Sequence, residues 1–213
     1  MADYLTYWSR HADKFSEALL EHLALVGIVL ACSLVVAIVI TLLLRRSQRV
    51  GQLVLSVLGA VYAIPSLALF SLLIPLTGLG FTTAVAVMVA YNQFLLVRNF
   101  TEGLDGVDHA IIEAARGMGM SERQILVKVQ LPLALPLILA GIRLAAISTI
   151  GIATIAVTIN AGGLGEILFS GLRTMNEYKI VGGTLLCAGL AAVVHVGLSE
   201  LETVLRMHVT HRR

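Results

Sequence analysis

Five long apolar runs constrain the fold of this chain more than any other feature of its sequence. They cover residues 23–44, 53–76, 81–100, 133–159 and 180–204. Each run is long enough to cross about 30 Å of hydrocarbon as an α-helix, and none shows the alternating pattern of a transmembrane β-strand. Only 13% of the residues are charged, too few for an ordinary soluble domain. We therefore predict an all-α integral membrane protein with five transmembrane helices, forming a single domain over residues 1–213.

Basic residues gather in the segments that would lie on one side of the membrane. They occupy the turn at 45–49, the segment 98–128 and the C-terminal tail. The positive-inside rule assigns this side to the cytoplasm, so we expect the N-terminus outside and the C-terminus in the cytoplasm. The net charge is only +2 and no basic stripe occurs, which argues against a nucleic-acid partner.

The segment 101–132 is the only long stretch with many polar residues between the apolar runs. Asp108 is a candidate N-cap for a short helix, which Gly117 and Gly119 are expected to end. Ser121, followed three residues later by a glutamine, forms a capping-box pattern that should start a second short helix at a new angle. We therefore predict a cytoplasmic elbow of two short helices.

A few polar or helix-breaking residues lie inside the apolar runs. Pro65 should kink or locally open the second span, because it removes a backbone donor at mid-length. Tyr91 and Asn92 belong to a polar cluster at mid-depth of the third span, where interhelical hydrogen bonds and the lining of a solute route are both open. Arg143 is expected to extend towards the cytoplasmic surface as an anchor.

A glycine-rich loop follows the fourth span. Gly162, Gly163 and Gly165 permit a tight turn with close backbone approach, and the next residues should form a short external helix. No Gly-Lys-Ser/Thr follows, so we expect no nucleotide site there or elsewhere in this chain.

The number of helices and the lack of acidic residues suggest how the protein is driven. Five helices are too few to enclose a gated route, so we expect a dimer with a second copy or a paralogue. We also expect no Asp or Glu within any span, whereas ion-coupled carriers usually need one. Energy should therefore arrive through a partner at the elbow.

Residues of the elbow carry a family signature, Glu113-Ala114-Ala115, then Gly119, then Val129-Gln130-Leu131-Pro132. This pattern resembles the EAA signature of bacterial ABC importer permeases, with the same spacing and with Val129 in place of Ile. Four further segments look like those of the permeases for osmoprotectants such as glycine betaine, choline and carnitine: Ile64-Pro65-Ser66-Leu67-Ala68-Leu69, Leu73-Ile74-Pro75, Arg98-Asn99 with Gly103, and Gly162-Gly163-Leu164-Gly165.

The resemblance implies a type I ABC importer permease fold in the bacterial cytoplasmic (inner) membrane. It implies a cytoplasmic ABC ATPase, which would bind ATP and Mg, an extracytoplasmic substrate-binding protein and the lipid bilayer as partners. The permease itself would be no enzyme and would bind no cofactor. The implied ATPase-docking residues are Glu113, Ala114, Ala115, Gly117, Gly119, Leu131 and Pro132.

The implied cargo is a quaternary amine, whose head is best held by aromatic faces. Tyr62 and Tyr91 are therefore candidates for the substrate path, together with Pro65 and Asn92 beside them. Two alternatives remain, a permease for methionine or another amino acid within the same fold, and an autonomous secondary carrier or channel. An intramembrane enzyme is poorly supported, because no paired carboxylates, metal-ligand spacing or Ser-His arrangement is evident.

Overall fold

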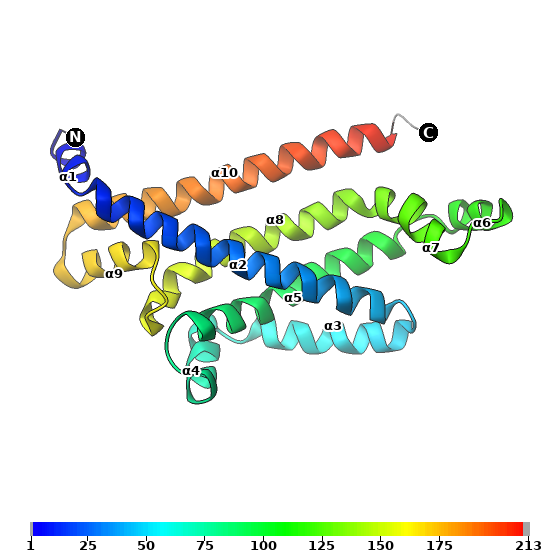
Figure 1. The fold of residues 1–213 in the computed structure, drawn as a ribbon, viewed down its shortest axis with the longest axis horizontal. Coiled ribbons are helices and arrows are strands. Elements are labelled where there is room, and N and C mark those ends of the chain that lie inside the picture. Colours follow the sequence, from blue (N-terminus) through cyan, green and yellow to red (C-terminus); the bar gives the residue numbers. More distant parts are fainter. Residues whose placement is uncertain (1, 211–213) are drawn as a thin grey trace.

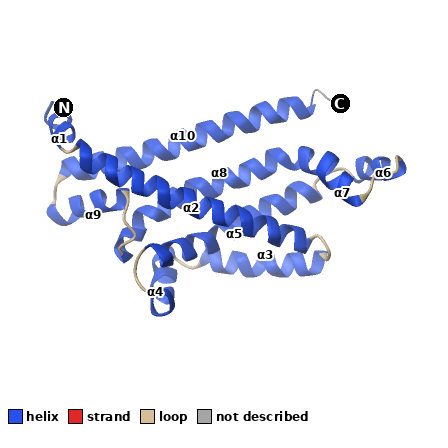
Figure 2. Ribbon diagram, viewed as in Figure 1, coloured by secondary structure: helices blue, strands red, loops and turns tan. Residues whose placement is uncertain are grey.

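The computed structural model describes the backbone of residues 2–210 and the side chains of residues 3–205. Every regular element in this part of the chain is a helix (Figure 2). Four helices are long and apolar enough to span a membrane: α2 (Ala12–Leu44), α5 (Phe81–Asp105), α8 (Leu131–Ile155) with the turns that flank it, and α10 (Glu177–Thr210). With α3 (Gln48–Ala63) and α4 (Ser66–Thr77), the bundle matches the predicted all-α membrane fold.

Short helices mark the two ends of this elongated bundle (Figure 1). One end, called the outer end below because the sequence predicts that it lies outside the cell, carries α1 (Ala2–Arg10) and α9 (Leu164–Thr174). The other, called the elbow end, carries α6 (His109–Gly117), α7 (Glu122–Ile125) and the last described turns of α10. The basic turn between α2 and α3 also lies at the elbow end, so it shares this end with the segment 98–128 as predicted from the sequence, while Arg212 and Arg213 of the tail lie outside the described residues.

The core is formed where α2, α5 and α8 pack together. Leu25, Val29, Val87, Met88 and Ile150 are almost completely buried there. Small residues bring two of these helices very close. A Cβ added to Gly141 of α8 would lie 2.6 Å from the Cβ of Asn99 on α5, so these two helices are held at a nearly fixed separation.

The second predicted span is broken rather than continuous. The structure places α3 and α4 at 98° to each other, with the break at residues 64–65. Pro65 has no N–H to continue the helix, and it forces the preceding residue, Ile64, into an extended conformation (ψ 131°). The sequence predicted a kink or local opening at this point, inside a span over 53–76, and the structure shows a full break there.

The expectation that no acidic residue lies within a span is wrong for the last one, because residues 180–204 include Glu200 and Glu202. Glu202 of α10 pairs with Arg143 of α8 at 3.2 Å, and the two side chains are 15% and 22% exposed. Arg143 is therefore tied to a neighbouring helix instead of extending freely to the surface. The pair links the last long helix to the helix that follows the elbow.

Candidate functional site

Local hydrogen bonds define the first helix of the elbow. At its start, the Ala110 N–H donates to Asp108 Oδ1 at 2.9 Å, which confirms the predicted N-cap. At its end, the Met120 N–H donates to the Ala115 carbonyl at 3.2 Å and the Gly119 N–H to the Arg116 carbonyl at 3.0 Å. This is a Schellman motif, and it requires the left-handed backbone that Gly119 adopts at φ +81°.

The N-cap of the second helix, Ser121, lies only two residues after this glycine. The Gln124 N–H donates to Ser121 Oγ, while the Ser121 N–H donates to Gln124 Oε1 at 2.8 Å, so the predicted capping box is formed. From α7 the chain runs through a π-helical turn (Leu126–Gln130) directly into α8. The second helix of the elbow, α7, is therefore continuous with a membrane-spanning helix.

Arg116 holds the two elbow helices together. Its guanidinium pairs with Glu122 of α7 at 2.7 Å and also with Glu113 one turn earlier on α6. The hydrogen bond to Glu122 and the charges of Glu122 and Glu113 raise the pKa of Arg116, so the guanidinium stays charged. Glu113, one of the implied ATPase-docking residues, therefore pairs within the chain in this structure.

The surface of the elbow includes most of the predicted docking residues. Glu113, Ala114, Gly117 and Gly119 are exposed, whereas Ala115 is 2% exposed and packs inward. Ala115 therefore supports the elbow from within and is not part of its outer face. The sequence analysis missed Met118, which lies between the two glycines and is 75% exposed. The exposure of Met118 could have been predicted, because it is an apolar residue between two glycines at a turn.

Leu131 and Pro132 lie apart from this face. Both are exposed, but they follow the π-helical turn and open α8. Pro132 has no N–H, so it cannot close the regular helical bond to Lys128, and the widened turn accommodates that loss. At the same point Arg45 Nη2 donates to Gln130 Oε1 at 2.6 Å. The start of α8 is thereby bound to the end of α2.

The predicted substrate-path residues gather around the break between α3 and α4. The Tyr62 and Tyr91 rings meet edge to face, with centroids 5.7 Å apart, and Tyr62 also contacts Phe94 at 5.2 Å. The Tyr91 hydroxyl donates to the Ile64 carbonyl, which the break leaves without a helical partner. Pro65 is exposed and Tyr62 is half-buried, whereas Tyr91 is only 4% exposed, so Tyr62 is the accessible member of the tyrosine pair.

Asn92 points the other way, into the bundle. It is 1% exposed, and its Nδ2 donates to Ser33 Oγ at 3.1 Å and Thr149 Oγ1 at 2.9 Å. Of the two roles left open by the sequence, the structure shows interhelical hydrogen bonding for this side chain. Asn92 therefore joins α2, α5 and α8 and does not face an open surface.

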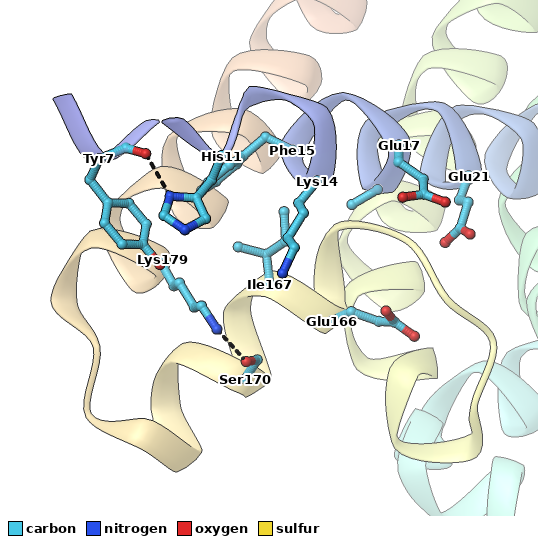
Figure 3. Close-up of a pocket in the computed structure, with 11 residues that line it drawn as sticks. Tyr7, His11, Lys14, Phe15, Glu17, Glu21, Glu166, Ile167, Ser170 and Lys179 are labelled. Carbon is cyan, nitrogen blue, oxygen red and sulfur yellow. Dashed lines mark hydrogen bonds between the residues drawn. The ribbon is translucent and has the colours of Figure 1, made fainter. Parts of the chain in front are cut away.

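The outer end carries a hollow of about 440 Å³ that the sequence analysis did not anticipate (Figure 3). Its charged lining residues come from three helices: Lys14, Glu17 and Glu21 of α2, Glu166 of α9 and Lys179 of α10. Glu21 also accepts a hydrogen bond from the Gly163 N–H at 3.0 Å, which attaches the predicted glycine turn to α2. The predicted turn and external helix are both formed, as Gly163 (φ +84°) followed by α9.

Comparisons with known proteins agree with this architecture. The family model described as "binding-protein-dependent transport system inner membrane component" matches residues 23–200. The carnitine transport permease protein OpuCB of Listeria monocytogenes is 35% identical over 93% of this chain and 91% of its own length. The osmoprotectant import permease protein OsmW of Salmonella typhimurium is 34% identical over 95% of this chain and 97% of its own length.

Solved structures show the same fold at lower sequence identity. An inward-facing structure of the MetNI methionine ABC transporter has a TM-score of 0.82 and 21% identity, covering 90% of this chain and 95% of that one. The similarity covers nearly the whole chain and therefore supports the fold as a whole.

Proposed function

The chain belongs to the family of binding-protein-dependent transport system inner membrane components, and on that premise we propose that it is the permease subunit of an ATP-driven importer of quaternary-ammonium osmoprotectants. The observation that carries the proposal is identity of 34–35% to permeases named for carnitine and osmoprotectant import, over more than nine tenths of the chain. The chain is a multi-pass membrane protein of the inner-membrane permease type. It contributes the solute route as one half of a dimer.

The elbow is the part of the chain that we propose the ATPase binds and moves. A separate cytoplasmic ATPase, which binds ATP and Mg, docks on the face formed by Glu113, Ala114, Gly117, Met118 and Gly119. The Schellman motif, the capping box and the Arg116 ion pairs make the elbow rigid. In addition, α7 continues into α8. Movement of the elbow is therefore transmitted to α8 and, through the hydrogen bond between Gln130 and Arg45, to α2.

The remaining partners follow from the same assignment. The elbow end faces the cytoplasm and the outer end faces an extracytoplasmic substrate-binding protein, in agreement with the basic residues at the elbow end. Around the break between α3 and α4, the half-buried Tyr62 offers an aromatic face to a cationic head that has no hydrogen-bond donors, and the buried Tyr91 packs edge to face against it. Selection of the exact amine rests largely with the binding protein.

Reconstitution tests this function against its alternatives. Proteoliposomes that contain the permease, its ATPase and its binding protein should take up radiolabelled glycine betaine, carnitine or choline only when ATP is present. An excess of methionine should not compete. Uptake driven by an ion gradient, with this chain alone and no ATP, would show an autonomous carrier or channel instead. Competition by methionine would show an amino-acid permease.

A further inference from the structure

The hollow at the outer end carries opposite charges on its two sides. Figure 3 shows the ammonium groups of Lys14 and Lys179 to the left of three carboxylates, those of Glu17, Glu21 and Glu166. Within the described residues, none of these five side chains forms an ion pair, although all of them line the same hollow. Its volume of about 440 Å³ lies in the range of small-molecule sites. Both charged sides are therefore available to a ligand.

The acidic side concentrates negative charge that the chain does not neutralise. Glu17 and Glu21 are four residues apart on α2, so they lie on one face of the helix, where like charges destabilise it. Glu166 of α9 adds a third carboxylate to the same hollow. Glu21 is held in place by the Gly163 N–H, and a Cβ added to Gly162 would lie 2.8 Å from its Oε2. A cationic group bound here would relieve the repulsion.

An aromatic ring lies beside the acidic side. A second hollow, of about 410 Å³, shares Glu21 and Glu166 with the first and is also lined by Phe81, which is 45% exposed. A trimethylammonium group has no N–H to donate, and it is attracted by carboxylate charge and by aromatic faces. Glu21, Glu166 and Phe81 supply both.

The basic side is suited to a carboxylate. Lys179 of α10 donates to Ser170 Oγ of α9 at 2.9 Å, which holds its ammonium group at the hollow. A lysine ammonium has three N–H donors, so two remain for a ligand. Lys14 of α2 is exposed and lines the hollow between Lys179 and the carboxylates (Figure 3).

We propose that this hollow receives a small zwitterion, with its carboxylate on Lys14 and Lys179 and its trimethylammonium group against Glu21 and Glu166. The inference rests on the proposed function and narrows the cargo to zwitterionic osmoprotectants such as glycine betaine and carnitine. Choline has the ammonium group but no carboxylate, so it would leave both lysines without a ligand. The hollow therefore discriminates against choline.

Direct binding to the permease–ATPase complex in phosphatidylglycerol nanodiscs, without ATP or binding protein, tests this site. Competition in saturation-transfer NMR compares three probes: glycine betaine, choline, and 3,3-dimethylbutyrate, in which carbon replaces the nitrogen of glycine betaine. An exposed ion pair contributes up to about 1 kcal/mol, which is a factor of about five in affinity. We therefore expect glycine betaine to bind about five-fold more tightly than either of the other two probes.

Substitutions on the two sides should have different effects. Glu21→Gln should abolish the preference over 3,3-dimethylbutyrate and retain the preference over choline, and Lys179→Gln should do the reverse. Each variant therefore serves as the folding control of the other. Glutamine at position 21 can still accept the Gly163 N–H. Asp13→Asn and Arg173→Gln, exposed at the same end but outside the hollow, should retain both preferences.

Three outcomes would overturn the proposal. The first is equal binding of the three probes by the wild type, or preferences that neither Glu21→Gln nor Lys179→Gln changes. The second is loss of glycine betaine binding in phosphatidylcholine nanodiscs, which would assign the hollow to a lipid headgroup. The third is weaker capture of the binding protein by both variants with unchanged probe preferences, which would make the hollow a docking surface.

The proposed function can fail separately. Binding is measured without ATP, so a negative result leaves ATP-dependent uptake by the wild-type complex intact. Absence of that uptake, or competition by methionine, would instead refute the proposed function.

Discussion

Substitutions of Gly119 distinguish backbone strain inside the elbow from contact with the ATPase. Gly119 has φ +81°, and no atom lies within 4 Å of the position that a Cβ would take. The penalty within the chain therefore comes from the left-handed backbone alone, about 1–2 kcal/mol for alanine. Asparagine enters this region more readily, so it should be less destabilising.

The two substitutions have opposite expected orders for stability and for docking. Gly119→Asn should be the more stable variant, but its larger side chain projects from the exposed face of the elbow. It should therefore bind the ATPase more weakly than Gly119→Ala, although alanine destabilises the elbow more. Gly189→Ala on α10 is the control, because no atom lies within 4 Å there either and the backbone is helical.

Three measurements on each variant are needed: the unfolding temperature, copurification with the ATPase, and ATP-dependent uptake in proteoliposomes. The expected result is that uptake follows docking, with alanine above asparagine, while stability has the reverse order. If uptake instead follows stability, with asparagine above alanine, the exposed face around Gly119 is not a contact surface and the reasoning is refuted. The control should match the wild type in uptake and docking.

Three further experiments test the contacts around the elbow and the core. Arg116→Gln should leave the unfolding temperature nearly unchanged, because the ion pairs of Arg116 are half-exposed. It should nevertheless speed amide hydrogen exchange in α6 and α7. Unchanged exchange would show that Arg116 does not hold the two helices together. A double-mutant cycle of Asn92→Leu and Thr149→Val should give a coupling of about 0.6 kcal/mol, typical of interhelical hydrogen bonds in membranes, and a coupling of zero would exclude that bond. Glu202→Gln should destabilise the protein by about 2 kcal/mol, less than a fully buried pair, and a further Arg143→Met change should recover most of the loss in the same unfolding assay.

Local sequence signals were enough to predict the elbow. The N-cap at Asp108, the glycine that ends α6 and the capping box at Ser121 each depend on residues within a few positions of one another. Ala115 shows the limit of such signals. Its helix and position were predictable, but its burial depends on how the whole elbow folds back on itself.

Contacts between distant segments were not predictable in the same way. The pairing of Arg143 with Glu202, and of Arg45 with Gln130, joins residues far apart in the chain. The position of the break at Pro65 could be predicted because proline lacks a donor, whereas the 98° angle depends on packing of α4 against its neighbours. Asn92 could likewise be recognised as a polar residue at mid-depth of its span. No sequence pattern indicated its hydrogen-bond partners, Ser33 and Thr149.

The break after α3 also determines how the protein fits the thickness of its bilayer. The 16 residues of α3 rise about 24 Å, at roughly 1.5 Å per residue, which is less than the approximately 30 Å of a typical hydrocarbon layer. Hydrophobic mismatch of this kind is met by local thinning of the bilayer or by neighbouring helices, at a fraction of a kcal/mol per Å. The stability of this chain should therefore depend on lipid acyl-chain length, with shorter chains suiting the side of the bundle that α3 presents.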